Sequence, residues 1–207
     1  MAEPNRLPAL SAYSRFGQRV RRRYPSERTL LADGLPTRET FEAMLGQLQA
    51  DGVELGPALR IVRQVALERL MTLDCDGHAS VADVTLAMTR LAECALDAAC
   101  RHVLHELDQT HGAPIGLDGQ RAQLWIIGMG KLGARELNVS SDIDLIYVYD
   151  QDGETSGNTL GRSAISNQEY FAKAVRALYA LIGDTTEHGF VFRVDLALRP
   201  NGNSGPP

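Results

Sequence analysis

The sequence predicts an α+β fold in which a helical N-terminal region, residues 1–115, precedes a small sheet with flanking helices over residues 116–207. Through the first part, apolar residues recur at intervals of three and four, the spacing of one face of a helix. Near residue 113 the pattern changes to short apolar runs between glycine- and proline-containing loops, which is typical of strands. Only a loop follows the last predicted strand, so we expect the sheet to be incomplete at the C-terminus.

Four helices are predicted in the N-terminal region, and two of them have recognisable start signals. Thr37 is a good helix cap because its hydroxyl can accept a hydrogen bond from the first turn. Pro57 suits a first helical turn, where its missing N–H is not needed. The predicted bounds are 9–24, 37–52, 57–77, and from Ser80 or Asp83 to about Leu107.

The second part alternates strands with one helix. The segment 167–182 has apolar residues at helical spacing, whereas the runs before and after it are short and apolar. Residues 150–162 are polar and contain glycine, so they are predicted to be a loop. Trp125, in the first run, is expected to be a core residue. The predicted strands are 124–127, 144–149 and 190–198.

Composition limits the possible functions. The net charge of −5 over 207 residues argues against a nucleic-acid-binding protein. No apolar run approaches the ~20 residues of a membrane helix, and no secretory signal precedes the early basic cluster. The three cysteines form no Cys-x-x-Cys pair, so they are expected to be reduced core thiols. These features predict a cytoplasmic protein without a membrane partner.

Two aspartates, Asp142 and Asp144, stand at the start of a predicted strand. Alternate side chains of a strand point to the same face, so both carboxylates are expected on one side of the sheet. Carboxylate oxygens are the ligands that Mg²⁺ prefers. The preceding turn, Gly-Met-Gly-Lys-Leu-Gly at 128–133, can bring backbone N–H groups against a phosphate. The combination predicts metal-assisted transfer of a nucleotidyl group.

The glycine turn also matches the Gly-x-Gly-x-x-Gly fingerprint of dinucleotide-binding proteins. That fold needs a helical crossover of roughly 10–12 residues or more between two parallel strands. Only nine residues, 134–142, follow the turn, and several of them are poor helix formers. We therefore reject the dinucleotide-binding alternative and expect a single helical turn near residues 134–137.

A third carboxylate, Asp195, lies in the last predicted strand. Alternation puts Arg193 and Asp195 on the face opposite Val194. If this strand lies beside that of Asp142 and Asp144, the three carboxylates converge and can hold two Mg²⁺ ions for an in-line displacement. Arg193 and Arg199 are then candidate phosphate-binding residues, because a guanidinium can form paired hydrogen bonds to phosphate oxygens.

Two blocks of sequence carry a family resemblance. A glycine turn, an Asp-x-Asp strand and a later Asp form the layout of the nucleotidyltransferase superfamily that includes DNA polymerase β. More narrowly, residues 128–146 (GMGKLGARELNVSSDIDLI) and 189–206 (GFVFRVDLALRPNGNSGP) resemble the signature of the glutamine synthetase adenylyltransferase/adenylyl-removing family. The resemblance implies a polymerase-β-like core. Its implied Mg²⁺ ligands are Asp142, Asp144 and Asp195, and its implied phosphate or nucleotide contacts are Gly130, Lys131, Gly133, Ser140 and Ser141.

The resemblance also implies an activity. The family carries two such domains in tandem, and the residues here look like the N-terminal, adenylyl-removing copy, in truncated form. The implied reaction is phosphorolysis, in which phosphate releases AMP from a tyrosine of glutamine synthetase as ADP. A PII signal protein is an implied regulator, through regions outside this chain. Two alternatives remain open, namely attachment of AMP from ATP by the same type of site, and an inactive fragment that serves only as an interaction module.

Overall fold

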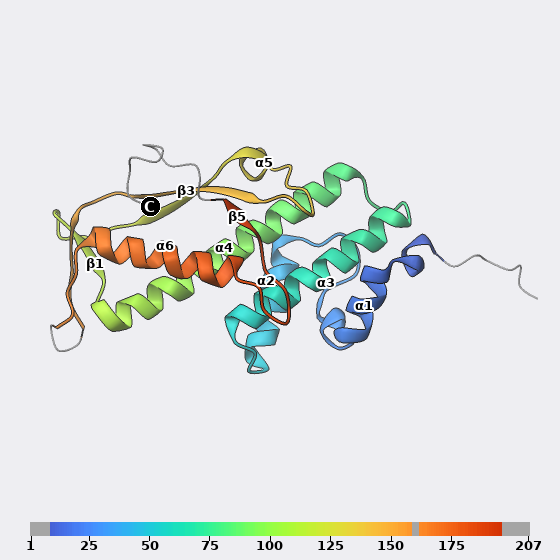
Figure 1. Cartoon of the computed structure of the whole chain (residues 1–207), viewed down its shortest axis with the longest axis horizontal. Helices are drawn as coiled ribbons and strands as arrows, with labels where there is room; N and C mark the ends of the chain where they lie inside the picture. The colour runs from blue at the N-terminus through green and yellow to red at the C-terminus, as the bar shows by residue number, and fades with distance from the viewer. Residues whose placement is uncertain (1–8, 159–161, 196–207) are drawn as a thin grey trace, which may run out of the picture. The chain divides into compact units, whose positions relative to one another are not determined.

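The computed structural model describes residues 9–158 and 162–195 (Figure 1). The chain divides into two compact units, Met1–Cys94 and Ala95–Pro207. The division falls inside helix α4 (Val81–His111), earlier than the boundary after residue 115 that the sequence suggested. The fold is mixed α and β, as predicted, and all strands among the described residues lie in the second unit. Among the described residues, no helix combines the length and the apolar character needed to cross a membrane.

The first unit contains three main helices and the start of α4. Helices α1 (Arg15–Arg23) and α2 (Arg38–Ala50) both pack against α3 (Leu55–Cys75). The core between them holds large buried side chains, including Phe41, Met44 and Leu70. The helical elements are η1 (Leu10–Tyr13), α1 (Arg15–Arg23), η2 (Glu27–Leu30), α2 (Arg38–Ala50), α3 (Leu55–Cys75) and α4.

Helix boundaries in this unit follow the capping residues. Thr37 caps α2 as predicted, since its hydroxyl accepts a hydrogen bond from the N–H of Thr40. The single helix predicted over 9–24 is wrong, because Ser14 interrupts it: the Ser14 hydroxyl accepts from the N–H of Gly17 at 3.1 Å and starts α1 there. Cys75, expected in the core, is exposed at the end of α3, whereas Cys94 is buried as predicted.

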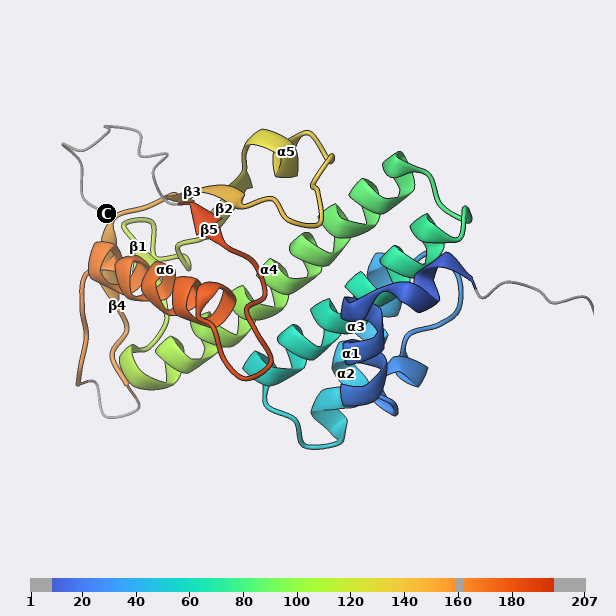
Figure 2. The same ribbon diagram turned by 45° about the vertical axis from the view of Figure 1, so that its right-hand side comes forward.

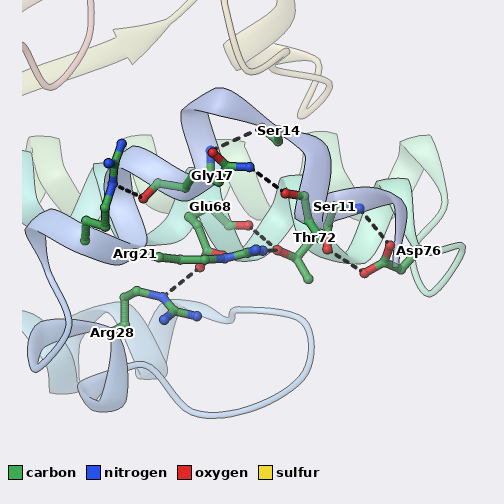
Figure 3. A network of polar contacts seen from close by, with 11 residues as sticks. Ser11, Ser14, Gly17, Arg21, Arg28, Glu68, Thr72 and Asp76 are labelled. Carbon is green, nitrogen blue, oxygen red and sulfur yellow. Dashed lines mark hydrogen bonds and ion pairs between the residues drawn. The ribbon is translucent and has the colours of Figure 1, made fainter. Parts of the chain in front are cut away.

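A buried carboxylate joins three elements of the first unit (Figure 3). The side chain of Glu68 in α3 is only 3% exposed and accepts hydrogen bonds from Nε of Arg21 at 2.6 Å and Nε of Arg28 at 3.1 Å. Arg21 also donates to the hydroxyl of Thr72 at 2.9 Å. Arg21 lies in α1 and Arg28 in η2, so Glu68 ties both elements to α3.

The second unit is built on a three-stranded sheet in the order β2-β3-β5. Strands β2 (Leu124–Gly128) and β3 (Ile143–Tyr149) are antiparallel, whereas β3 and β5 (Val194–Asp195) are parallel. The antiparallel pairing confirms that the dinucleotide-binding alternative was rightly rejected, since that fold needs parallel strands here. Residues 196–198 of the predicted last strand lie outside the described residues.

A second, two-stranded sheet was not predicted. Strand β1 (Pro114–Gly116) pairs with β4 (Gly153–Thr155), which lies in the segment expected to be a loop. Helix α6 (Asn167–Gly183) follows and agrees with the predicted 167–182. Its first residue, Asn167, is buried and donates to the carbonyls of Ile115 and Gln151, which anchors the helix to this small sheet.

Helix α6 runs along one face of the larger sheet (Figures 1 and 2), and a core cluster of the second unit joins α6 and that sheet to Leu104 and Leu107 of α4. The ring of Phe171 stacks on Tyr149 with centroids 5.1 Å apart, and Leu124 packs against the same cluster. Alternation along β2 therefore sends Leu124 inward and Trp125 outward. Trp125 is 59% exposed, so its expected place in the core is wrong.

Candidate functional site

The glycine turn follows β2 and leads toward β3, the strand that carries Asp144. After Gly128 the chain forms one helical turn, α5 (Gly130–Gly133), earlier than the turn expected at 134–137. The N–H of Met129 donates to the carbonyl of Asp144 at 2.8 Å, which extends the contact between the two strands. Leu132 is buried and holds the turn against the sheet.

Two glycines of the turn lie in close contact with other residues of the turn. A Cβ on Gly133 would lie 2.5 Å from the carbonyl oxygen of Gly128, and a Cβ on Gly128 would lie 2.9 Å from the side chain of Leu132. The N–H of Gly133 donates to the carbonyl of Met129, so it holds the turn together in this structure. Lys131, between these glycines, is exposed. The phosphate-binding roles of Gly130, Lys131 and Gly133 stay predictions.

Asp144 and Asp195 are neighbours on the central and last strands. The register of β3 with β5 pairs Ile143 with Val194 and Asp144 with Asp195. Adjacent strands are ~4.8 Å apart, and residues paired in register point to the same face. The side chains of Asp144 and Asp195 therefore start from neighbouring positions on the face opposite the core. Alternation predicted this face for Asp195, whereas the pairing of its strand with β3 was only a condition of the prediction.

Asp142 occupies a different environment. It lies one residue before β3 rather than within it, and its carboxylate accepts a hydrogen bond from Nε of Arg193. Nη2 of the same guanidinium donates to the carbonyl of Ser140 at 2.5 Å, and the guanidinium carbon is 5.9 Å from the centre of the Phe190 ring. Arg193, predicted to bind phosphate, is thus held by Asp142 and the Ser140 backbone.

The ion pair between Arg193 and Asp142 is open to solvent, with side chains 56% and 51% exposed. Exposed ion pairs contribute only about 0–1 kcal/mol, so the guanidinium can exchange this partner for another anion at little cost. Ser140 is exposed and Ser141 half-buried beside it. Within residues 9–158 and 162–195, no group of three or more His, Cys, Asp or Glu side chains is arranged to hold a metal ion. Arg199 lies outside the described residues.

The face that carries Asp144 and Asp195 continues into an apolar surface. Ile146 and Val148 follow Asp144 at every second position of β3, and the strand register pairs Val148 with Trp125 and Ile146 with Ile127. Trp125, Ile127 and Val148 are 59%, 44% and 42% exposed. Sequence reasoning missed this surface, although the alternation of β2 could have indicated it once Leu124 was assigned to the core.

On the inner face, the chemistry differs. Tyr147 lies three residues after Asp144 in β3. Side chains an odd number of residues apart in a strand point to opposite faces, so Tyr147 points to the inner face. Burial, together with the nearby Cys100 thiol, raises the pKa of the Tyr147 phenol to about 12. Burial and the neighbouring Asp97 likewise raise the pKa of the Cys100 thiol. Both groups are therefore neutral near pH 7, and neither is suited to act as a nucleophile.

The comparison with known proteins settles the family. Residues 9–207 match the family described as glutamate-ammonia ligase adenylyltransferase. The chain belongs to this family. Bifunctional glutamine synthetase adenylyltransferase/adenylyl-removing enzymes are similar to it: that of Burkholderia mallei is 47% identical over 82% of this chain and 19% of its own length. The protein of Aromatoleum aromaticum is 43% identical over 98% of this chain and 22% of its own length.

The family match includes both blocks on which the resemblance rested, residues 128–146 and 189–206. The Ralstonia nicotianae relative is 44% identical over 97% of the chain, so the helical first unit also belongs to the shared sequence. The chain spans about a fifth of the length of these curated relatives.

Proposed function

We propose that this chain carries a nucleotidyl-transfer site that removes AMP from adenylylated glutamine synthetase by Mg²⁺-dependent phosphorolysis. The observation that carries the proposal is the strand register that puts Asp144 beside Asp195, next to the glycine turn. Family membership supports the reaction class, because the relatives are named for both adenylyl transfer and adenylyl removal. The sequence around the site looks like the copy that removes AMP, which supports removal over attachment.

The carboxylate pair suits Mg²⁺. In proteins this ion keeps several waters and takes one or two carboxylates together with substrate phosphates, so a pair is a sufficient protein contribution. Asp144 and Asp195 would hold a first ion, and Asp142 would complete a site for a second once Arg193 has moved to another anion. When bound, Mg²⁺ polarises a phosphoryl oxygen and stabilises the negative charge that develops during transfer.

The residues of the chain would bring two phosphates together. A phosphate oxygen attacks the phosphorus of AMP, and the bond from that phosphorus to the tyrosine oxygen breaks. The tyrosine oxygen takes up a proton from water, and the AMP leaves joined to the attacking phosphate as ADP. Arg193 can neutralise the incoming phosphate with two parallel hydrogen bonds, and Lys131 in the glycine turn can add a second positive charge.

The test is to incubate the 207-residue chain with adenylylated glutamine synthetase, Mg²⁺ and phosphate, and to measure ADP. We expect ADP to form. Asp144→Asn or Asp195→Asn should lower the rate of ADP formation by about 10- to 100-fold or more, the loss typical of a disturbed metal site. Asp152→Asn is the matched control, because Asp152 only accepts a hydrogen bond from Tyr149 and an amide oxygen can still do so.

Three outcomes would contradict the proposal. Undiminished ADP formation by Asp144→Asn would remove the assigned role of that carboxylate. AMP attachment from ATP to unmodified glutamine synthetase, without ADP formation from the modified form, would assign the opposite direction. The absence of both reactions would favour the alternative of an interaction module.

A further inference from the structure

The first glycine of the α5 turn lies directly against a proposed metal ligand. A Cβ built on Gly130 would be 2.6 Å from Oδ2 of Asp144 and 3.7 Å from its Cγ. In real proteins, a Cβ atom essentially never lies within 3.0 Å of a heavy atom from outside its own residue and chain neighbours. The carboxylate of Asp144 therefore occupies space that exists only because residue 130 has no side chain.

The backbone adds a second requirement at the same position. Gly130 has φ +52°, in the left-handed region that side chains with a Cβ adopt at a cost of about 1 kcal/mol or more. The other turn glycines have different reasons to be glycine: Gly128 faces Leu132, and Gly133 faces the Gly128 carbonyl. Of the three, only Gly130 faces a carboxylate.

The main chain of Asp144 has little freedom to yield. Its carbonyl accepts the Met129 N–H at 2.8 Å, and its Cα is in register with that of Asp195. A side chain at position 130 would therefore be accommodated by rotation of the Asp144 carboxylate rather than by movement of the strand. Such a rotation would carry Oδ2 away from its present position beside Gly130 and would reorient the carboxylate on the face that Asp195 shares.

We infer that Gly130 is a positioning residue for the Asp144 carboxylate, and that its glycine is needed for metal binding rather than only for the turn. This inference rests on the proposed role of Asp144 as a Mg²⁺ ligand. The sequence led us to expect a phosphate contact at Gly130. The inference assigns a different function, because Oδ2 of Asp144 occupies the position that a side chain of residue 130 would take.

The test compares Gly130→Ala with Gly119→Ala in the 207-residue chain. Gly119 also has a left-handed backbone, φ +78°, but a Cβ there meets nothing within 4 Å. Both variants therefore acquire backbone strain, and only the first disturbs Asp144. Binding of Mn²⁺, a paramagnetic substitute for Mg²⁺, is measured by electron paramagnetic resonance, and the melting temperature is recorded for each variant.

We expect both variants to melt at lower temperature and Gly130→Ala alone to weaken Mn²⁺ binding by about 10-fold or more. In an Asp144→Asn background, Gly130→Ala should cause no further loss, because the two residues act on one ligand. If Gly130→Ala does not fold, Gly130→Asn keeps the Cβ in a residue type that tolerates the left-handed backbone better, and the same loss is expected.

The inference and the proposed function fail in distinguishable ways. Unchanged Mn²⁺ binding by Gly130→Ala would overturn the inference, and so would an equal loss of binding in Gly119→Ala. If Asp144→Asn still weakens Mn²⁺ binding in that case, the proposed role of Asp144 as a ligand stands. Mn²⁺ binding that is insensitive to Asp144→Asn, or absent from the unmodified chain, would overturn both.

Discussion

Arg193 holds the carboxylate of Asp142 through its Nε and the backbone carbonyl of Ser140 through its Nη2. One of the three predicted metal ligands is therefore paired with one of the predicted phosphate ligands. The pair is half exposed, so it forms an exchangeable contact rather than a structural one. Under the proposed function, a phosphate that attracts Arg193 would release Asp142, and anion binding would then be coupled to metal binding at this end of the sheet.

Arg193→Ala should tighten Mn²⁺ binding to the chain while weakening phosphate binding. The substitution removes a positive charge beside Asp142 and frees its carboxylate, so we expect a gain of about 3- to 10-fold for the metal, equivalent to about 1 kcal/mol. Electron paramagnetic resonance measures Mn²⁺, and calorimetry measures phosphate. Arg176→Ala, an exposed arginine on α6 whose Nε donates to the Ala172 carbonyl, serves as the control. Weaker Mn²⁺ binding by Arg193→Ala would contradict the coupling.

Glu68→Gln should destabilise the first unit. The Glu68 side chain is nearly inaccessible to solvent, and it carries the negative charge that balances the guanidinium groups of Arg21 and Arg28. A neutral amide at this position removes that charge. Breaking a fully buried pair costs about 3–5 kcal/mol, and because these arginines are about a third exposed we expect a loss of about 2 kcal/mol in the free energy of unfolding. Urea unfolding followed by circular dichroism measures the change.

Glu42→Gln is the matched control for that measurement. Glu42 pairs with Arg38 on the surface of α2, with side chains 46% and 36% exposed. Its loss should change the free energy of unfolding by no more than about 0.5 kcal/mol, the value of an exposed pair four residues apart in a helix. Equal effects of the two substitutions would show that Glu68 is not a structural anchor.

Tyr147 should make the stability of the second unit depend on alkaline pH. Burial raises the pKa of its phenol to about 12 in the folded chain. The unfolded chain loses this proton near the ordinary pKa of about 10, so the contribution is fully present below pH about 10 and is lost as pH rises to about 12. Tyr147→Phe should flatten the decline in the free energy of unfolding over that interval.

Ultraviolet titration provides the direct check on Tyr147. The difference between the spectra of the unmodified chain and Tyr147→Phe isolates one phenol, which should ionise about two units higher in the folded chain than in urea. Ionisation near pH 10 in both conditions would mean that the inner face of β3 is open to water.

Trp125 is the only tryptophan of the chain and reports on the outer face of the sheet. With 59% of its surface exposed, its fluorescence should resemble that of indole in water and be quenched readily by acrylamide. Unfolding in urea should shift the emission little, because the ring is already hydrated. A large red shift on unfolding would show that Trp125 is covered in the folded chain.

Local features of the sequence accounted for most of the elements. The spacing of apolar residues predicted α2, α3 and α6, and Thr37 marked the start of α2 through its capping hydroxyl. The short connection after the glycine turn excluded a crossover helix, and β2 and β3 are indeed antiparallel. Alternation placed Asp195 and Val194 on opposite faces. These features depend on the nearest residues in the chain, so they are visible without the fold.

Contacts between distant segments were decided by the tertiary structure. The register that sets Asp144 beside Asp195 required the last strand to pair with β3, a choice that no local pattern contains. The pairing of Arg193 with Asp142, the exposure of Trp125 and the contact of Gly130 with Asp144 depend on the same packing. By itself, the sequence determined which residues could carry the chemistry. Which of them meet was decided only when the strands aligned, because side-chain neighbours across a sheet depend on strand order and register.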